Sequence, residues 1–201
     1  RLNGVATSRV IRALSEVEVP VGVRELASVA QVSPGSVSKL LVTLAAEGIV
    51  DRDARGALTG VRRRSLLRRW VQDYGYATTN PGLGYWLAPR GLAQVTDRLA
   101  KQEGVAVTGS AAARRLLPPD ATSVVPLRLF ALYAASPRRL AEQLGLVEAD
   151  AATANAVIVA PQDQRILPQA GEPVALAPTA LVLADLLTLP GRSDAEAEQL
   201  M

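Results

Sequence analysis

The sequence predicts an α+β protein of two domains, a small helical domain that ends in a hairpin and a larger domain of mixed helices and strands. In the first seventy residues, apolar positions recur at helical spacing in three successive segments, and a short hairpin pattern follows. Beyond residue 74, short apolar runs typical of strands alternate with amphipathic segments, without a clear βαβ repeat. We therefore predict domains at residues 1–73 and 74–201.

Charge is distributed unevenly between these two parts. Residues 1–70 contain 12 Lys and Arg against 6 Asp and Glu, whereas residues 71–201 contain 10 against 13. A basic first part joined to a mildly acidic remainder indicates that an anionic partner binds the first part.

The composition excludes several kinds of chemistry. The 201 residues include no Cys and no His, which removes the usual thiolate and imidazole metal ligands and also Ser-His-Asp and Cys-His catalysis. Disulfides are excluded as well, in keeping with a reducing compartment. We predict no metal, no cofactor and no enzymatic activity.

We expect a cytoplasmic protein without a membrane partner. The stretch Arg1–Arg12 has no continuous apolar run, so no signal peptide is predicted there. The longest apolar stretch, Val174–Leu189, contains Pro178 and Asp185 and is shorter than the ~20 residues that a membrane-spanning helix needs. It fits a strand and a helix of the core.

Three helices are predicted in the first domain, over Val5–Val17, Val23–Ala30 and Pro34–Glu47. Ser33 is a good N-cap for the third helix, Pro34 suits its first position, and Gly48 suits its end. The apolar face of this helix consists of Val37, Leu40, Leu41 and Leu44.

The opposite face of the third helix has small or polar side chains, which allow a helix to approach base edges in the major groove of DNA. Ser36 lies near the helix start, where phosphates meet backbone N–H groups and the positive end of the dipole. The residues of this face are Gly35, Ser38, Lys39, Val42 and Thr43.

A hairpin with a charged tip follows, with strands over Ile49–Arg52 and Ala57–Thr59. In this position it is the wing of a winged helix-turn-helix, and Arg52 and Arg55 could reach phosphates or a minor groove. The segment LLVTLAAEGIVDR, Leu40–Arg52, resembles the passage from recognition helix to wing in the MarR and IclR families. The alternatives are a helical bundle without a DNA function and a winged domain that binds protein.

A basic segment, Arg62–Trp70, is predicted to form a helix with Leu66, Leu67 and Trp70 on its inner side. Its arginines either form a solvated face or clamp a phosphate backbone. The scarcity of aromatics argues against single-stranded or RNA partners. The candidate DNA-binding residues are Ser33, Gly35, Ser36, Ser38, Lys39, Thr43, Arg52, Arg55, Arg62, Arg63 and Arg64.

The second domain is predicted to begin with a loop over Tyr74–Gly84. Its expected strands are Tyr85–Leu87, Val105–Val107, Ala156–Ala160 and Val174–Leu176, with extended chain over Val124–Tyr133. Its expected helices are Pro89–Glu103, Ala111–Leu117, Pro137–Leu144, Thr179–Leu187 and Ser193–Met201.

Few residues of the second domain indicate chemistry. The turn Thr108-Gly109-Ser110 could hold a phosphate, although an ordinary N-cap turn is favoured. Gly82-Leu83-Gly84 lacks the third glycine of a dinucleotide-binding motif. Asp163, Asp185 and Asp194 are scattered, so solvated or capping roles are expected, and Arg138 and Arg139 are expected on a solvated helix face.

Several segments together resemble the AbiEi family of type IV toxin–antitoxin antitoxins, in the family's order and approximate spacing. They are VTGSAAARRLLP (Val107–Pro118), LYAASPRRLAEQLGL (Leu132–Leu146), ANAVIVAPQDQRIL (Ala154–Leu167) and ALVLADLLTLPGRSDAEAEQLM (Ala180–Met201). The resemblance implies a bacterial repressor that binds repeats in its own promoter, with an antitoxin domain after the winged domain. It also implies opposition to a nucleotidyltransferase-like toxin without a stable toxin complex.

Three functions are considered for such a chain. The first is a repressor of the antitoxin type that binds double-stranded DNA, with two copies on a repeat and a C-terminal domain that adds DNA contacts or self-association. The second is a ligand-responsive regulator whose C-terminal domain binds a small-molecule effector. The third, an enzyme that docks through its winged domain, is disfavoured by the missing His and Cys.

Overall fold

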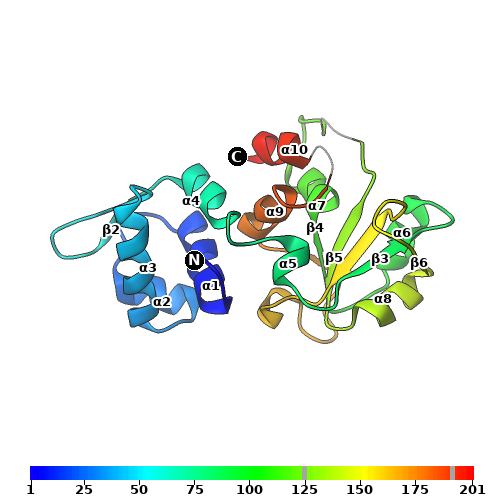
Figure 1. Cartoon of the computed structure of the whole chain (residues 1–201), viewed down its shortest axis with the longest axis horizontal. Helices are drawn as coiled ribbons and strands as arrows, with labels where there is room; N and C mark the ends of the chain where they lie inside the picture. Colours follow the sequence, from blue (N-terminus) through cyan, green and yellow to red (C-terminus); the bar gives the residue numbers. More distant parts are fainter. Residues whose placement is uncertain (124–125, 191–192) are drawn as a thin grey trace. The chain divides into compact units, whose positions relative to one another are not determined.

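The computed structural model describes residues 1–123, 126–190 and 193–201. The chain divides into two compact units, Arg1–Tyr74 and Gly75–Met201. The first consists of helices and one hairpin, and the second of helices on a mixed sheet (Figure 1). The predicted α+β class is therefore confirmed.

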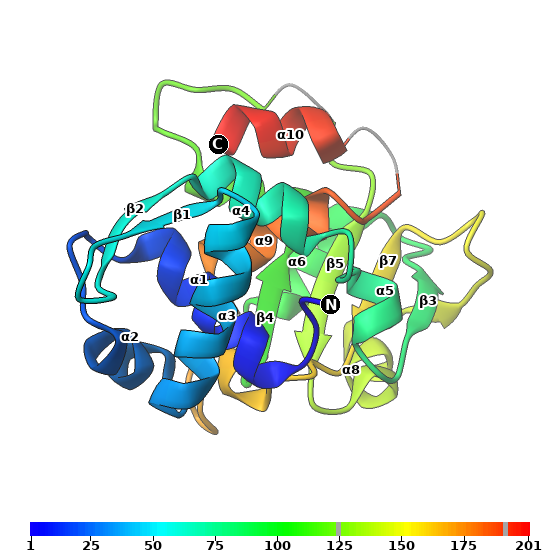
Figure 2. The same ribbon diagram turned by 60° about the vertical axis from the view of Figure 1, so that its left-hand side comes forward.

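The first unit is built from helices that pack against one another, and the hairpin projects beside the third helix (Figures 1 and 2). The residues predicted to face inward on the third helix and on the basic helix are buried, as helical periodicity predicts. The elements are α1 (Val5–Glu16), α2 (Val23–Ala30), α3 (Pro34–Ala46), β1 (Val50–Arg52), β2 (Leu58–Val61) and α4 (Arg63–Trp70).

Local signals set the bounds of α3. The Oγ of Ser33 accepts the N–H of Ser36 at 3.2 Å, and Pro34 occupies the first turn. Gly48 follows the helix with φ 69°, a conformation that costs glycine little. Between α2 and α3, Gln31 takes a left-handed conformation with φ 52°, and this residue turns the chain. The predicted N-cap is thus confirmed.

The second strand of the hairpin extends to Val61, beyond the predicted end at Thr59, and a backbone segment outside the hairpin pairs with it. Val50 pairs with Val61 and Asp51 with Gly60 in antiparallel register. Val21, between α1 and α2, forms a bridge to Leu58, with N···O distances of 3.0 and 2.9 Å. The backbone of this connecting segment thereby fixes the hairpin against the helices.

The second unit contains a mixed sheet, which has six strands among the described residues in the order β6-β3-β7-β5-β4-β8. β5 is parallel to β7 and β4 is parallel to β8, while the other neighbours are antiparallel. The strands are β3 (Gly84–Leu87), β4 (Val105–Thr108), β5 (Phe130–Ala134), β6 (Val147–Glu148), β7 (Ala156–Val159) and β8 (Ala175–Leu176).

Helices cover both faces of this sheet (Figure 1), with α7 and α9 on one face and α8 with α6 on the other. Because both faces are covered, β4, β5 and β7 are buried along their length, which explains their continuous apolar sequences. The helices are α5 (Tyr76–Thr79), α6 (Leu92–Leu99), α7 (Gly109–Leu116), α8 (Pro137–Leu144), the short 3₁₀ helix η1 (Gln164–Ile166), α9 (Thr179–Leu186) and α10 (Ser193–Leu200).

Several predicted elements differ from the structure. The predicted loop Tyr74–Gly84 contains the short helix α5, and the helix predicted over Pro89–Glu103 is confined to Leu92–Leu99. A turn in which the Gly91 N–H donates to the Ala88 carbonyl occupies the expected helix start. The extended stretch predicted from Val124 is a strand from Phe130 onward, and Val124 and Val125 lie outside the described residues.

The sequence shows no clear βαβ repeat, and the structure contains a parallel crossover between β5 and β7. The chain passes from β5 through α8, and then through the short edge strand β6, to the parallel neighbour β7. This crossover is hidden in the sequence because β6 and a loop separate the helix from the second strand.

The expected role of Asp185 was wrong, because this carboxylate is neither solvated nor a helix cap. It is 0% exposed and accepts hydrogen bonds from Thr108 Oγ1 at 2.5 Å and Tyr133 Oη at 2.8 Å. Asp163 does cap η1, through the N–H of Arg165. Burial of a charge requires such partners, and those of Asp185 come from β4 and β5.

The turn Thr108-Gly109-Ser110 likewise departs from an ordinary N-cap turn. Thr108 precedes α7 but makes no side-chain cap to it among the described residues, since its hydroxyl binds Asp185. The hydroxyl of Ser110 donates to Glu196 of α10, which is also buried. The polar side chains of this turn therefore join α7 to the last two helices.

Candidate nucleic-acid interface

The candidate interface starts at the outer face of α3, where the predicted site residues come together. Ser38 is half-buried, and the other predicted residues of α3 and its cap are exposed: Ser33, Gly35, Ser36, Lys39 and Thr43. The inner face is formed by Val37, Leu40, Leu41 and Leu44, each at most 8% exposed. Burial of this stripe turns the small and polar face outward.

The first turn of α3 is open to an approaching anion. Gly35 has no side chain, and a Cβ built there would find Ser33 Oγ 4.0 Å away as its nearest neighbour. The hydroxyls of Ser33 and Ser36 lie 2.9 Å apart. Pro34 has no N–H, and the N–H of Ser36 is bonded to Ser33. The N–H of Gly35 and the positive dipole end of α3 are therefore what this turn offers to a phosphate oxygen.

Lys39 is the cation of this face. No ion pair or side-chain hydrogen bond engages its ammonium group within the part of the chain that the structure describes. One turn further on, the hydroxyl of Thr43 donates to the backbone carbonyl of Lys39 at 3.3 Å. The Lys39 side chain is thus available for an acceptor outside the protein, such as a guanine edge or a phosphate.

The wing has a tightly bonded tip. Asp53 Oδ1 accepts the backbone N–H groups of Arg55 and Ala57, at 2.9 and 2.8 Å. Arg52 Nε donates to the Gly56 carbonyl at 3.1 Å. Arg52 therefore braces the tip. The guanidinium of Arg55 is exposed and has no such partner among the described residues, which makes it the cation that the wing offers to a ligand.

Within the predicted arginine cluster, Arg62 and Arg63 have different partners, and Arg64 is exposed in the first turn of α4. Arg63 donates from Nε to the Ser15 carbonyl and from a terminal nitrogen to the Val17 carbonyl, both at 2.8 Å. These carbonyls end α1 and lack helical partners, so Arg63 caps α1. Arg62 pairs with Asp51 of the wing at 3.2 Å, and both side chains stay more than half exposed.

A second ion-pair group, which the sequence analysis missed, surrounds Arg69. Its guanidinium contacts Glu47 at 2.8 Å and Asp73 at 3.0 Å, and these interactions raise the pKa of Arg69. Asp73 also accepts the backbone N–H of Leu2 at 2.7 Å, which, with Arg69, lowers the pKa of Asp73. Only the i,i+4 spacing of Arg69 and Asp73 was visible in the sequence.

A comparison with family models assigns this region. Residues 7–54 match the IclR helix-turn-helix domain. The match covers most of α1, all of α2 and α3, and the hairpin up to its tip. The chain thus carries an IclR-type helix-turn-helix at its N-terminal end, which supports a DNA-binding transcriptional regulator. Comparisons with curated proteins and with solved structures found no match.

The IclR-type helix-turn-helix supports double-stranded DNA as a partner. No cluster of three or more His, Cys, Asp or Glu that could bind a metal ion occurs among the described residues. Within those same residues, no helix is long and apolar enough to cross a membrane.

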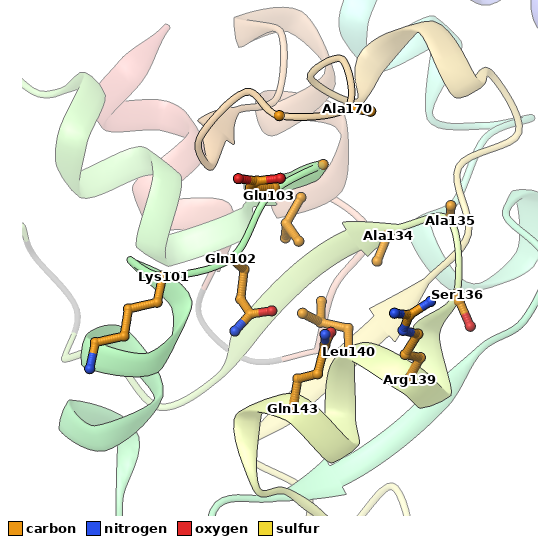
Figure 3. Close-up of a pocket in the computed structure, with 13 residues that line it drawn as sticks. Lys101, Gln102, Glu103, Ala134, Ala135, Ser136, Arg139, Leu140, Gln143 and Ala170 are labelled. Atoms are coloured by element: carbon orange, nitrogen blue, oxygen red, sulfur yellow. The ribbon is translucent and has the colours of Figure 1, made fainter.

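A hollow of about 560 Å³ lies in the second unit (Figure 3). Gln102 and Gln143 point into it, while Lys101 reaches away from the other labelled side chains. Its lining also includes Val105 of β4, Leu140 of α8 and Arg139 near the start of α8. Its volume lies in the range of small-molecule sites, ~300–1,000 Å³.

Proposed function

We propose that this protein is a sequence-specific regulator of transcription that binds double-stranded DNA with α3 in the major groove. The observation that carries the proposal is the outer face of α3, where small side chains surround the unengaged Lys39. Among the alternatives, a helical bundle with no DNA function offers no reason for an exposed glycine, serines and a lysine on one face.

The proposed contacts divide by chemistry. The backbone N–H of Gly35, beside the hydroxyl of Ser36, holds a backbone phosphate and sets the depth of the helix in the groove. Lys39 donates to a guanine edge. Arg55 at the tip of the wing contacts the neighbouring backbone or minor groove.

We further propose a cytoplasmic repressor of the AbiEi type, without enzymatic activity, that binds repeats in its own promoter. One winged domain reads one half-site, so two copies on a repeat supply the affinity that specific binding needs. Asp185 and Glu196, two of the buried carboxylates of the second unit, accept hydrogen bonds from hydroxyl groups and do not line the hollow of Figure 3. These hydrogen bonds support a structural role for the two acids rather than a catalytic one.

The test is a binding titration of the full chain with its own promoter region at two salt concentrations. Lys39→Ala should cost ~1–3 kcal/mol of binding free energy if Lys39 bonds a base, with relaxed specificity at one position. Arg55→Ala should lower the log–log salt slope by about 0.9 if it contacts one phosphate. Arg24→Ala, on the outer surface of α2, serves as the matched charge control.

Two results would contradict the proposal. Equal affinity for promoter and scrambled duplex at both salt concentrations would remove sequence-specific binding. Unchanged affinity of Lys39→Ala for all duplexes would remove Lys39 from the interface, whether as a base contact or as a phosphate contact.

A second candidate is a ligand-responsive regulator whose C-terminal unit binds a small-molecule effector. The hollow beside α8 favours it, because polar side chains of Gln102, Arg139 and Gln143 line a space of about 560 Å³ (Figure 3). A metabolite that raises the Tm of the wild type, but not that of Gln143→Ala, and shifts DNA affinity would support this function. A panel without any such shift would count against it.

A further inference from the structure

Val42 is an apolar residue on the outer face of α3. It is 57% exposed, although every other large apolar residue of this helix is buried. It lies three residues after Lys39, so the two side chains share one side of the helix. Folding of the first unit therefore does not explain a valine at this position.

Exposure alone would carry little weight, since single apolar residues are common on protein surfaces. Val29 of α2 is 61% exposed and illustrates this. Val42 differs in its surroundings, because it stands in the face that contains Gly35 and Lys39. The hydroxyl proton of the adjacent Thr43 is donated to the Lys39 carbonyl, so it is not free to bond a base.

Valine has properties that suit recognition of an apolar group. Its β-branched side chain holds one strongly preferred rotamer in a helix, so contact with a ligand costs little conformational entropy. In the major groove, the apolar group that distinguishes one base is the 5-methyl of thymine. The other bases present hydrogen-bonding groups to the major groove, and the Val42 side chain has no donor or acceptor to bond them.

We propose that Val42 contacts the 5-methyl group of a thymine in each half-site, close to the base bonded by Lys39. This inference rests on the proposed function. Residues three apart on a helix are separated by a rise of about 4.5 Å, and successive bases by about 3.4 Å. The two recognised bases therefore lie within one or two steps of each other.

The test uses deoxyuridine, which differs from thymine only by the missing methyl group. Duplexes are selected from a random library on the full wild-type chain, and each thymine of one half-site is then replaced singly. Binding is measured for wild type, Val42→Ala and Val29→Ala, with thermal unfolding as the control for folding. Val29→Ala is matched in chemistry and exposure but lies on α2.

At one thymine, deoxyuridine should weaken wild-type binding about fourfold, the change that corresponds to ~0.8 kcal/mol for one methyl-sized apolar group. Val42→Ala should bind the thymine and deoxyuridine duplexes alike, whereas Val29→Ala should keep the difference. Selective binding with no deoxyuridine effect, or with an effect that Val42→Ala retains, would overturn the inference and leave the proposed function standing. Failure to select any duplex would overturn both.

Discussion

At the scale of single residues, the first unit depends on polar side chains that satisfy backbone groups. Ser33 accepts the N–H of Ser36 at the start of α3, and Asp73 accepts the N–H of Leu2 near the chain start. Unpaired backbone groups at helix ends and chain ends are costly to bury and depend on such partners. Each bond can be removed by one substitution.

Ser33→Ala should destabilise the first unit by ~1 kcal/mol, because α3 loses its N-cap. Chemical denaturation followed by circular dichroism would measure the change in unfolding free energy. Ser36→Ala is the matched control, since it removes a hydroxyl of the same turn and keeps the capping bond. Equal losses in both variants would show that the cap contributes nothing.

Asp73 should cause the unfolding free energy of the first unit to fall as the solution becomes acidic. The N–H of Leu2 and the guanidinium of Arg69 lower the folded-state pKa of Asp73 below its usual 3.8. The stabilisation is thus complete above the unfolded pKa and is lost as pH falls through the folded pKa. Between pH 5 and 2, wild type should lose more stability than Asp73→Asn; parallel profiles would contradict this assignment.

At the scale of elements, the winged domain is held by contacts that join its ends and connections. The Arg63 side chain, at the start of α4, bonds carbonyls at the end of α1, and Val21 pairs with β2. These bonds fix the start of α4 and the hairpin to the segment that follows α1, and so hold the hairpin against the helices.

Arg63→Ala should lower the unfolding free energy by about 1 kcal/mol, because two carbonyls at the end of α1 lose their charged donor. Arg62→Ala, in contrast, removes only an exposed ion pair and should change stability by less than ~0.5 kcal/mol. Thermal unfolding of both variants distinguishes them. A larger loss in Arg62→Ala would reverse the roles assigned to these neighbours.

At the scale of the whole molecule, the chain combines an IclR-type helix-turn-helix with a second unit on a mixed sheet. In the proposed function, a single winged domain presents one recognition helix to one half-site. On that proposal, specific occupancy of a repeat depends on two copies of the chain.

A duplex with both half-sites should bind two copies at saturation, and the same duplex with one half-site scrambled should bind one copy with lower affinity. Sedimentation of labelled duplex gives the number of copies, and a titration gives the affinity. One copy per intact duplex at saturation would contradict the two-copy arrangement.

The helices of the first unit can be predicted from local sequence patterns, together with the inner face of α3. The spacing of Val37, Leu40, Leu41 and Leu44 defines one stripe of α3, and Ser33 and Gly48 mark its ends. These signals are readable because capping and helical periodicity act between residues at most a few positions apart. The outer face, with Lys39 and Val42, then follows from geometry.

The hydrogen-bond partners of the polar side chains became apparent from the folded structure and could not be predicted from the sequence. Arg63 bonds Ser15, 48 residues away, and Asp185 bonds Thr108, 77 residues away. In the sequence, nothing distinguishes Arg63 from the arginines on either side of it, and Asp185 resembles a solvated acid. Partners so distant are brought together by packing of the apolar core, and no local pattern records that packing.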